Sequence, residues 1–203
     1  GENDIYIDAE KTATDQSLCW AAAAANTLYY TGWLTSNTKD EDDIFSSFRN
    51  SFVQNGGGNA HYGYEWYLSG TYNAPQSVDQ PYSSGGFFSS AVSSSSFYLY
   101  NMQCVGSSNI MALCANELKN GNAVTIGYGN YDSTGSRYNG HAITLWGYTY
   151  DSNITSESSD YYKGIIYTDS DDNIVASGIN PKTAQNVMRI WDMKWDSSTS
   201  SYK

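Results

Sequence analysis

The feature that most limits the possible folds is a change in hydrophobic period at Gly121. Before Gly121, apolar residues recur about every 3.6 residues, as in helices; after it they alternate, as in strands. Helices are predicted over residues 17–31, 39–53 and 107–120, and strands over 123–129, 142–150, 164–168 and 187–194. Helices followed by antiparallel strands predict an α+β fold. We expect one domain over 1–203, with a helical lobe at about 15–120 and a β lobe at about 121–195.

The first predicted helix begins at a cysteine. The segment DQSLCWAAAAANTLYYTG places Cys19 in the first turn, with Asp15 or Ser17 as the expected N-cap and Gly32 just past the helix end. Unpaired N–H groups and the helix dipole stabilise an anion there, so they favour the thiolate. The position therefore suits a nucleophile. The alternative is that Cys19 is one more small buried side chain in an alanine-rich core helix.

A histidine and two aspartates lie at the ends of predicted strands. In NGHAITLWGYTY, His141 shares a strand face with Ile143 and Leu145, where packing would fix its position. In GIIYTDSDDN, a buried strand runs directly into Asp169 and Asp171. An aspartate at the end of a neighbouring strand can hold the tautomer of a histidine. The alternatives are a core histidine at position 141 and a calcium loop or plain acidic turn at TDSDDN.

The order cysteine, histidine, aspartate is the one expected of papain-like thiol hydrolases. Such chemistry needs no cofactor, and we expect none. The three cysteines, Cys19, Cys104 and Cys114, have the spacing neither of a disulfide framework nor of a metal site. Two interpretations of the last two stay open. Cys104 and Cys114 would pair in an exported protein, or Cys114 would be a core thiol of its helix.

The charge of the chain argues against two classes of partner, and its hydropathy argues against a membrane span. The net charge of −11, from 21 acidic and 10 basic residues, argues against nucleic acid and against anionic lipid as a partner. No apolar run approaches the roughly 18 residues of a membrane span. No signal peptide is visible, and we interpret Gly1 as the start of a mature chain, which is compatible with export.

Two motifs carry a narrower resemblance. HAITLWGYTYDSN followed by IIYTDSD resembles the corresponding segment of the immunoglobulin-degrading cysteine endopeptidases of the IdeS/Mac type. In that family a His-x-Ile-x-Leu-Trp-Gly strand precedes a Tyr-x-Thr-Asp-Ser-Asp strand end. The start is also similar, with Leu18-Cys19, then Ala21, Ala22 and Asn26, as is Glu117-Leu118 followed by Gly121. The resemblance spans most of residues 15–173.

The resemblance implies a papain-like fold and a set of roles. Cys19 would be the nucleophile, His141 the general base and acid, and Asp169 the residue that orients it. Asp171 matches a second aspartate that the family needs. Two departures stand out. Trp20 stands where the family has a glycine after the cysteine, and papain itself also has a tryptophan there. The family's oxyanion lysine lies about ten residues before the cysteine, where this chain has Ala9; Lys11 is the nearest lysine, and Gln16 is the alternative donor.

We therefore expect a secreted or cell-surface cysteine endopeptidase that cleaves a protein substrate, for which the resemblance implies immunoglobulin. One alternative is a Cys-His-Asp amidase or transglutaminase acting on cell-wall peptides or glutamine side chains. Another is a binding module that keeps the fold. The aromatic stretch 62–72 and the Ser/Gly-rich segment 83–96 are interpreted as surface that contacts the substrate, with core packing as the alternative for the aromatics. The natural substrate and the oligomeric state stay open.

Overall fold

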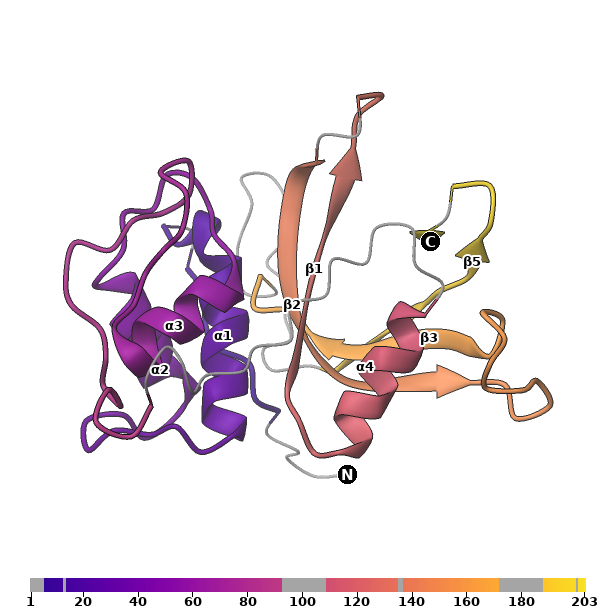
Figure 1. Ribbon diagram of the computed structural model, residues 1–203, viewed down its shortest axis with the longest axis horizontal. Helices are drawn as coiled ribbons and strands as arrows, with labels where there is room; N and C mark the ends of the chain where they lie inside the picture. The colour runs from indigo at the N-terminus through magenta and orange to yellow at the C-terminus, as the bar shows by residue number, and fades with distance from the viewer. Residues whose placement is uncertain (1–5, 13, 93–108, 135–136, 172–187, 200) are drawn as a thin grey trace.

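The helices α1, α2 and α3 gather in one half of the molecule, and the sheet and α4 form the other half (Figure 1). The computed structural model describes residues 6–12, 14–92, 109–134, 137–171, 188–199 and 201–203. A helical lobe contains α1, α2 and α3, and a β lobe contains a four-stranded antiparallel sheet together with α4. The predicted α+β class is therefore confirmed. None of the helices in the described ranges has the length and apolar character to cross a bilayer.

The central helix of the helical lobe is α1, Cys19–Tyr30, preceded by the short 3₁₀ helix η1, Gln16–Leu18. The expected caps are wrong, because Leu18 occupies the N-cap position and no side chain caps the helix. The expected end is confirmed. Gly32 has φ +81°, and the Trp33 N–H donates to the Leu28 carbonyl at 2.9 Å, which closes the last turn.

Two further helices complete this lobe. α2 is Glu41–Arg49, shorter than the predicted 39–53, and its N-cap Asp40 accepts a hydrogen bond from the Asp43 N–H at 2.9 Å. α3 is Ala60–Ser69. The interpretation of the aromatic stretch as surface is wrong for Trp66 and Tyr67, which are 1% and 0% exposed in the core of the lobe. The alternative, core packing, is the one observed for these two rings.

The Ser/Gly-rich segment also packs against the helical lobe. Gly85 approaches Trp66 so closely that an added Cβ would lie 2.1 Å from the Trp66 carbonyl oxygen. Phe88 packs edge-on against Trp33 at 5.1 Å between ring centroids. The part of 83–96 up to residue 92 therefore belongs to the body of the lobe, and residues 93–96 lie outside the described ranges.

The sheet has the order β1-β2-β3-β4, with every neighbouring pair antiparallel. Its strands are β1 Val124–Tyr131, β2 Arg137–Tyr150, β3 Tyr162–Thr168 and β4 Arg189–Asp192. All four were predicted, with bounds that differ by a few residues. A separate two-stranded ribbon, β5 Trp195–Asp196 with β6 Ser201–Tyr202, was not predicted.

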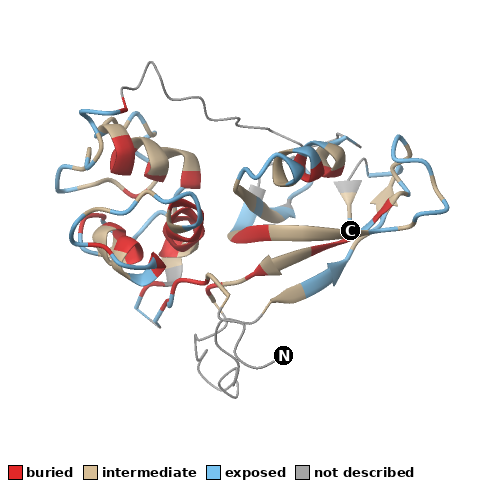
Figure 2. Cartoon of the chain, turned by 90° about the horizontal axis from the view of Figure 1, so that it is seen from below, coloured by how far each residue is buried: buried red, intermediate tan, exposed pale blue. Residues whose placement is uncertain are grey.

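The two faces of β2 contact different helices. Ile143 and Leu145 face α4, Ile110–Lys119, in a core that includes Cys114 at 2% exposure. Ala142 and Thr144 face α1, and buried positions concentrate in the helices and in the strands next to them (Figure 2). α4 therefore packs with the β lobe, although its residues fall within the predicted helical lobe of 15–120. Cys104, the other half of the possible disulfide, lies outside the described residues.

Residues 6–12 form an extended segment that joins the two lobes. The Ala9 N–H donates to Asn26 Oδ1 of α1 at 2.7 Å, and Asn26 Nδ2 donates to Thr144 Oγ1 of β2 at 3.0 Å. At the end of β3, Thr168 Oγ1 donates to the Ile7 carbonyl at 3.1 Å. After the strand, Ser170 Oγ donates to Asp8 Oδ1 at 2.9 Å, and Lys11 pairs with Asp171. We call residues 6–12 the crossing segment.

Candidate active site

Cys19 is the first residue of α1, at the boundary between the lobes. Its neighbour Trp20 is 1% exposed and packs edge-on against Phe52 at 5.1 Å, and the indole N–H donates to Asp79 Oδ2 at 3.3 Å. These contacts fix the backbone at the start of the helix. The thiol itself is only partly buried, and it lies close enough to His141 and to the Ala142 N–H for both to lower its pKa. The helical lobe thus supplies a thiol that is held against β2.

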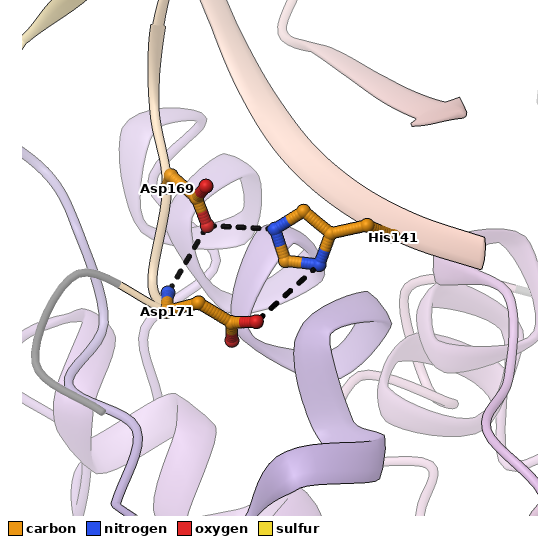
Figure 3. A group of neighbouring side chains, drawn as sticks. All are labelled: His141, Asp169 and Asp171. Carbon is orange, nitrogen blue, oxygen red and sulfur yellow. Dashed lines mark hydrogen bonds and ion pairs between the residues drawn. The ribbon is translucent and has the colours of Figure 1, made fainter. Parts of the chain in front are cut away.

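His141 lies in β2, opposite Tyr128 of β1. Its Nε2 is 2.7 Å from Asp169 Oδ1, as Figure 3 shows. Because Nε2 is engaged by the carboxylate, Nδ1 is the ring nitrogen left for the Cys19 thiol. The edge of the Tyr128 ring covers the imidazole, with 5.5 Å between centroids and an interplanar angle of 89°. The ring is therefore held from two sides.

The two aspartates follow β3 and contact different ring nitrogens of His141 (Figure 3). The Asp171 N–H donates to Asp169 Oδ1 at 3.1 Å, which fixes the carboxylate that contacts His141. Asp171 Oδ2 lies 3.6 Å from His141 Nδ1, within ion-pair distance. Its other oxygen pairs with the ammonium group of Lys11 from the crossing segment. Asp169 therefore orients the histidine, and Asp171 connects it to a buried positive charge.

The surroundings of Cys19 favour its thiolate. Burial alone raises the pKa of a thiol, but the hydrogen bond from His141 and the positive charges of His141 and Lys11 outweigh it. The pKa of Cys19 is therefore lowered below its ordinary value.

The histidine is shifted in the opposite direction. Burial disfavours the imidazolium, but the hydrogen bonds to Asp169 and Cys19 and the negative charges of both aspartates raise the pKa of His141 to about 10. The raised pKa of His141 keeps the imidazolium present at neutral pH, and the lowered pKa of Cys19 shifts its thiol toward the thiolate. This is the ionisation state that a cysteine nucleophile with its own proton donor requires.

Lys11 was predicted as an oxyanion donor. Its side chain is 0% exposed, and its charge reaches Cys19. An electrostatic role needs no movement, whereas donation to a substrate oxygen requires the ammonium to become accessible. The Cys19 backbone N–H at the helix start is a donor already in place. Gln16 begins η1, and the position of its side chain lies outside what the structure describes.

His141, Asp169 and Asp171 also have the composition of a metal site, with ligand atoms within 4.8 Å of one another. However, the Lys11 ammonium is already paired with Asp171. A second cation would be repelled by this buried charge. The raised pKa of His141 also disfavours the neutral imidazole that a metal needs. The arrangement of His141, Asp169 and Asp171 therefore fits acid–base chemistry better than metal binding.

Tyr128 was not singled out from the sequence, although it contacts the histidine. The signal was present in the pairing of the two predicted strands, because residues opposite each other in antiparallel strands are neighbours. Only the register, with Tyr128 opposite His141, turns this rule into a named contact.

Iodoacetamide is expected to alkylate Cys19 at pH 6 at least about 100-fold faster than Cys114, because only the thiolate reacts and Cys114 is buried. An ordinary thiol gains about tenfold in rate per pH unit below its pKa. For Cys19 the rate should rise less steeply between pH 6 and pH 9 than for an ordinary thiol, because its pKa is lowered. Mass spectrometry of tryptic peptides, Cys104 included, measures each rate. His141→Ala should restore the steep pH dependence; equal labelling of all three cysteines would contradict the assignment.

Comparison of the sequence with protein-family models and with curated proteins, and of the fold with solved structures, gave no match. The functional argument therefore stands on the geometry of the site and on the motifs of the sequence.

Proposed function

We propose that this chain is a cysteine endopeptidase of papain-like arrangement, in which α1 carries the nucleophile and the sheet carries its base. The observation that supports it most is the convergence of three side chains from both lobes: His141 contacts Asp169 at 2.7 Å, and Cys19 lies close enough to His141 for the imidazole to lower its pKa. The opposite pKa shifts of the thiol and the imidazole agree with this use. A structural histidine would not need an ionised partner on each side.

The reaction divides into two acyl transfers. The Cys19 thiolate attacks the carbonyl carbon of the scissile bond, and the negative charge that develops on oxygen meets the free N–H groups at the start of α1. As the C–N bond breaks, the His141 imidazolium donates its proton to the leaving amine. The neutral imidazole then takes a proton from water, whose oxygen attacks the thioester and releases the acid and the thiolate. Asp169 keeps the imidazole oriented in both steps.

The motifs extend the proposal to a class of substrate. HAITLWGYTY and IIYTDSD resemble the IdeS/Mac-type endopeptidases, and the two motifs hold His141, Asp169 and Asp171. On this basis we propose that the enzyme is secreted or presented at the cell surface and that its substrate is a protein, with immunoglobulin as the first to test. Trp66 and Tyr67 offer no surface to such a substrate, since both are core residues.

The test is incubation with immunoglobulins of several classes and with casein, followed by mass spectrometry of the termini produced. New internal cleavage sites that are lost in Cys19→Ala support an endopeptidase. A transglutaminase passes the acyl group to an amine instead of water, so a dansylated amine is added in parallel. Amine incorporation without chain cleavage would indicate a transglutaminase in place of an endopeptidase. Release of ammonia or of cell-wall peptide would indicate an amidase. Binding without any turnover would indicate a binding module.

A further inference from the structure

The imidazole of His141 has neighbours that compete for one of its two nitrogens (Figure 3). Asp169 Oδ1 holds Nε2 at 2.7 Å, which fixes one point of the ring. Nδ1 is the nitrogen left for Cys19, but Asp171 Oδ2 also lies 3.6 Å from it. One hydrogen bond lets the ring tilt about Nε2, because the outer torsion of a histidine side chain is soft. A tilt toward Asp171 would point the Nδ1 proton away from the thiol, so the reaction depends on a further restraint.

Tyr128 provides this restraint from the neighbouring strand. It lies opposite His141 in the register of β1 and β2, and the two rings stand at 89° with 5.5 Å between their centroids. Aromatic pairs favour such an edge-on arrangement. Burial, followed by the negative charge of Asp169, raises the pKa of Tyr128 to about 12. The phenol therefore stays neutral near neutral pH, and the contact acts by packing rather than by proton transfer.

Trp191 in turn contacts Tyr128, although it belongs to β4 at the opposite edge of the sheet. The two rings pack edge-on, with 5.2 Å between centroids and an interplanar angle of 71°. Rings on two edge strands can touch only if the sheet curls over the face they share. Tyr167 of β3 packs against Trp191 as well, at 6.4 Å. A row of aromatic rings thus connects β3 and β4 with the histidine.

We propose that Trp191 is a positioning residue for His141 and that it acts through Tyr128. The proposal rests on the proposed function, because the orientation of the imidazole matters to the thiol and to the leaving amine. Without Trp191, Tyr128 can lean into the vacated space, and His141 gains room to tilt toward Asp171. One aromatic contact biases such an equilibrium by about 2- to 10-fold. The effect should therefore be modest at Trp191 and larger at Tyr128, which touches the imidazole itself.

Steady-state rates on a cleaved substrate give the first test. Trp191→Ala should lower kcat by about fivefold and Tyr128→Leu by about 30-fold. KM should stay within about twofold for both, because the orientation of the imidazole affects proton transfer rather than substrate binding. Tyr128→Phe keeps the ring and should restore most of the rate that Tyr128→Leu loses. A rise in KM with unchanged kcat would mean that the rings bind substrate, and it would overturn the positioning role.

A double variant tests the order of the contacts. If Trp191 acts through Tyr128, its removal has no further effect once the Tyr128 ring is gone. Tyr128→Leu/Trp191→Ala should therefore be no slower than Tyr128→Leu. Losses that multiply would show that Trp191 reaches the reaction by another route, and they would overturn the proposal.

The matched controls are Tyr150→Leu and Trp195→Ala. Tyr150, the last residue of β2, stacks on Tyr161 at 5.1 Å, and Trp195 packs edge-on against Tyr202 at 5.1 Å in the separate ribbon. Both variants should leave kcat unchanged, and an equal loss in either would indicate a general loosening of the β lobe and overturn the specific role. Trp191 is 38% exposed, so Trp191→Ala opens no closed core, and circular dichroism should show native secondary structure.

A spectroscopic measurement separates this proposal from the proposed function. Proton NMR of protein with isotope-labelled histidine follows the Nε2 proton that His141 donates to Asp169, and His61→Ala identifies its signal. A fixed ring gives one sharp resonance, which Tyr128→Phe should keep and which Tyr128→Leu and Trp191→Ala should broaden. This result would support the positioning role even in a protein that cleaves nothing, in which case the endopeptidase proposal fails alone. A sharp resonance in both variants, or none in the native protein, would overturn the positioning role and leave the endopeptidase intact.

Discussion

Cys19→Ala and His141→Ala are each expected to lower kcat/KM by about 10⁴-fold or more, and the double variant should be no slower than either. The thiolate exists because of the imidazolium beside it, and the imidazolium delivers its proton only to an amine that the thiolate has displaced. Removal of one member therefore disables the other, and the free-energy losses do not add. Rates on a cleaved protein and on a peptide that contains the same bond measure this.

His61→Ala is the matched control, because His61 is the other of the two histidines in the chain and lies in α3 of the helical lobe. Its rate should stay within about twofold of the native rate. Losses that multiply in the Cys19→Ala/His141→Ala variant would mean that the two residues act independently. A His141→Ala enzyme with a tenth of native activity would show that another group moves the proton.

The two aspartates are expected to fail in different ways. Asp169→Asn should lower kcat/KM by about 10²- to 10⁴-fold with little loss of stability, because it removes the charge that holds the imidazolium. It should also slow alkylation of Cys19 at pH 6. Asp171→Asn removes the carboxylate that pairs with the buried Lys11, whose side chain is 0% exposed. It should lower the free energy of unfolding by about 2 kcal/mol or more. This estimate is set below that for a fully buried ion pair because Asp171 is partly exposed.

A double-mutant cycle checks the second effect. Lys11→Met/Asp171→Asn removes both charges and should be more stable than Asp171→Asn alone, since no buried ammonium is then left without its carboxylate. Urea unfolding of the native protein, both single variants and the double variant gives the coupling energy. Additive losses would show that the pair is not coupled. If Asp171→Asn slowed turnover far more than Asp169→Asn, the roles of the two aspartates would be reversed.

The periodicity of apolar residues was sufficient to predict the main helices and strands. Ile143 and Leu145 alternate with polar or small residues because only one strand face packs against α4. Gly32 and Gly121 mark helix ends because both have positive φ. The ribbon of β5 and β6 escaped prediction because strands of two residues carry no period. The N-cap of α1 escaped because η1 precedes it, which moves Asp15 out of the capping position.

The residues of the site could be listed from the sequence, and the structure brings Cys19, His141 and Asp169 together as expected. Helix starts and strand ends are positions where a side chain can reach a neighbouring element, which is why these residues stood out. The distribution of roles could not be derived this way. Lys11 and Asp171 are separated by 160 positions along the chain, and their pairing depends on the path of the crossing segment.

The burial of aromatic residues was the main error. Tyrosine and tryptophan have a large apolar body and one polar group, so the same residue serves in a core or on a surface. Trp66 is buried and still satisfies its indole N–H by donating to the Ser83 carbonyl at 3.2 Å. The amino-acid composition does not show whether such a hydrogen-bond acceptor is nearby. The packing of Ser83 near α3 decides whether Trp66 can be buried.

The crossing segment has a consequence for how this molecule would lose activity. Within a few residues it binds α1 through Ala9 and the end of β3 through Ile7, and it supplies Lys11 to the aspartate beside the histidine. Separation of the lobes would break these bonds and take the nucleophile away from its base at the same moment. A molecule with its halves apart would thus lack the proposed peptidase activity, so partly denatured copies would not cleave their intact neighbours.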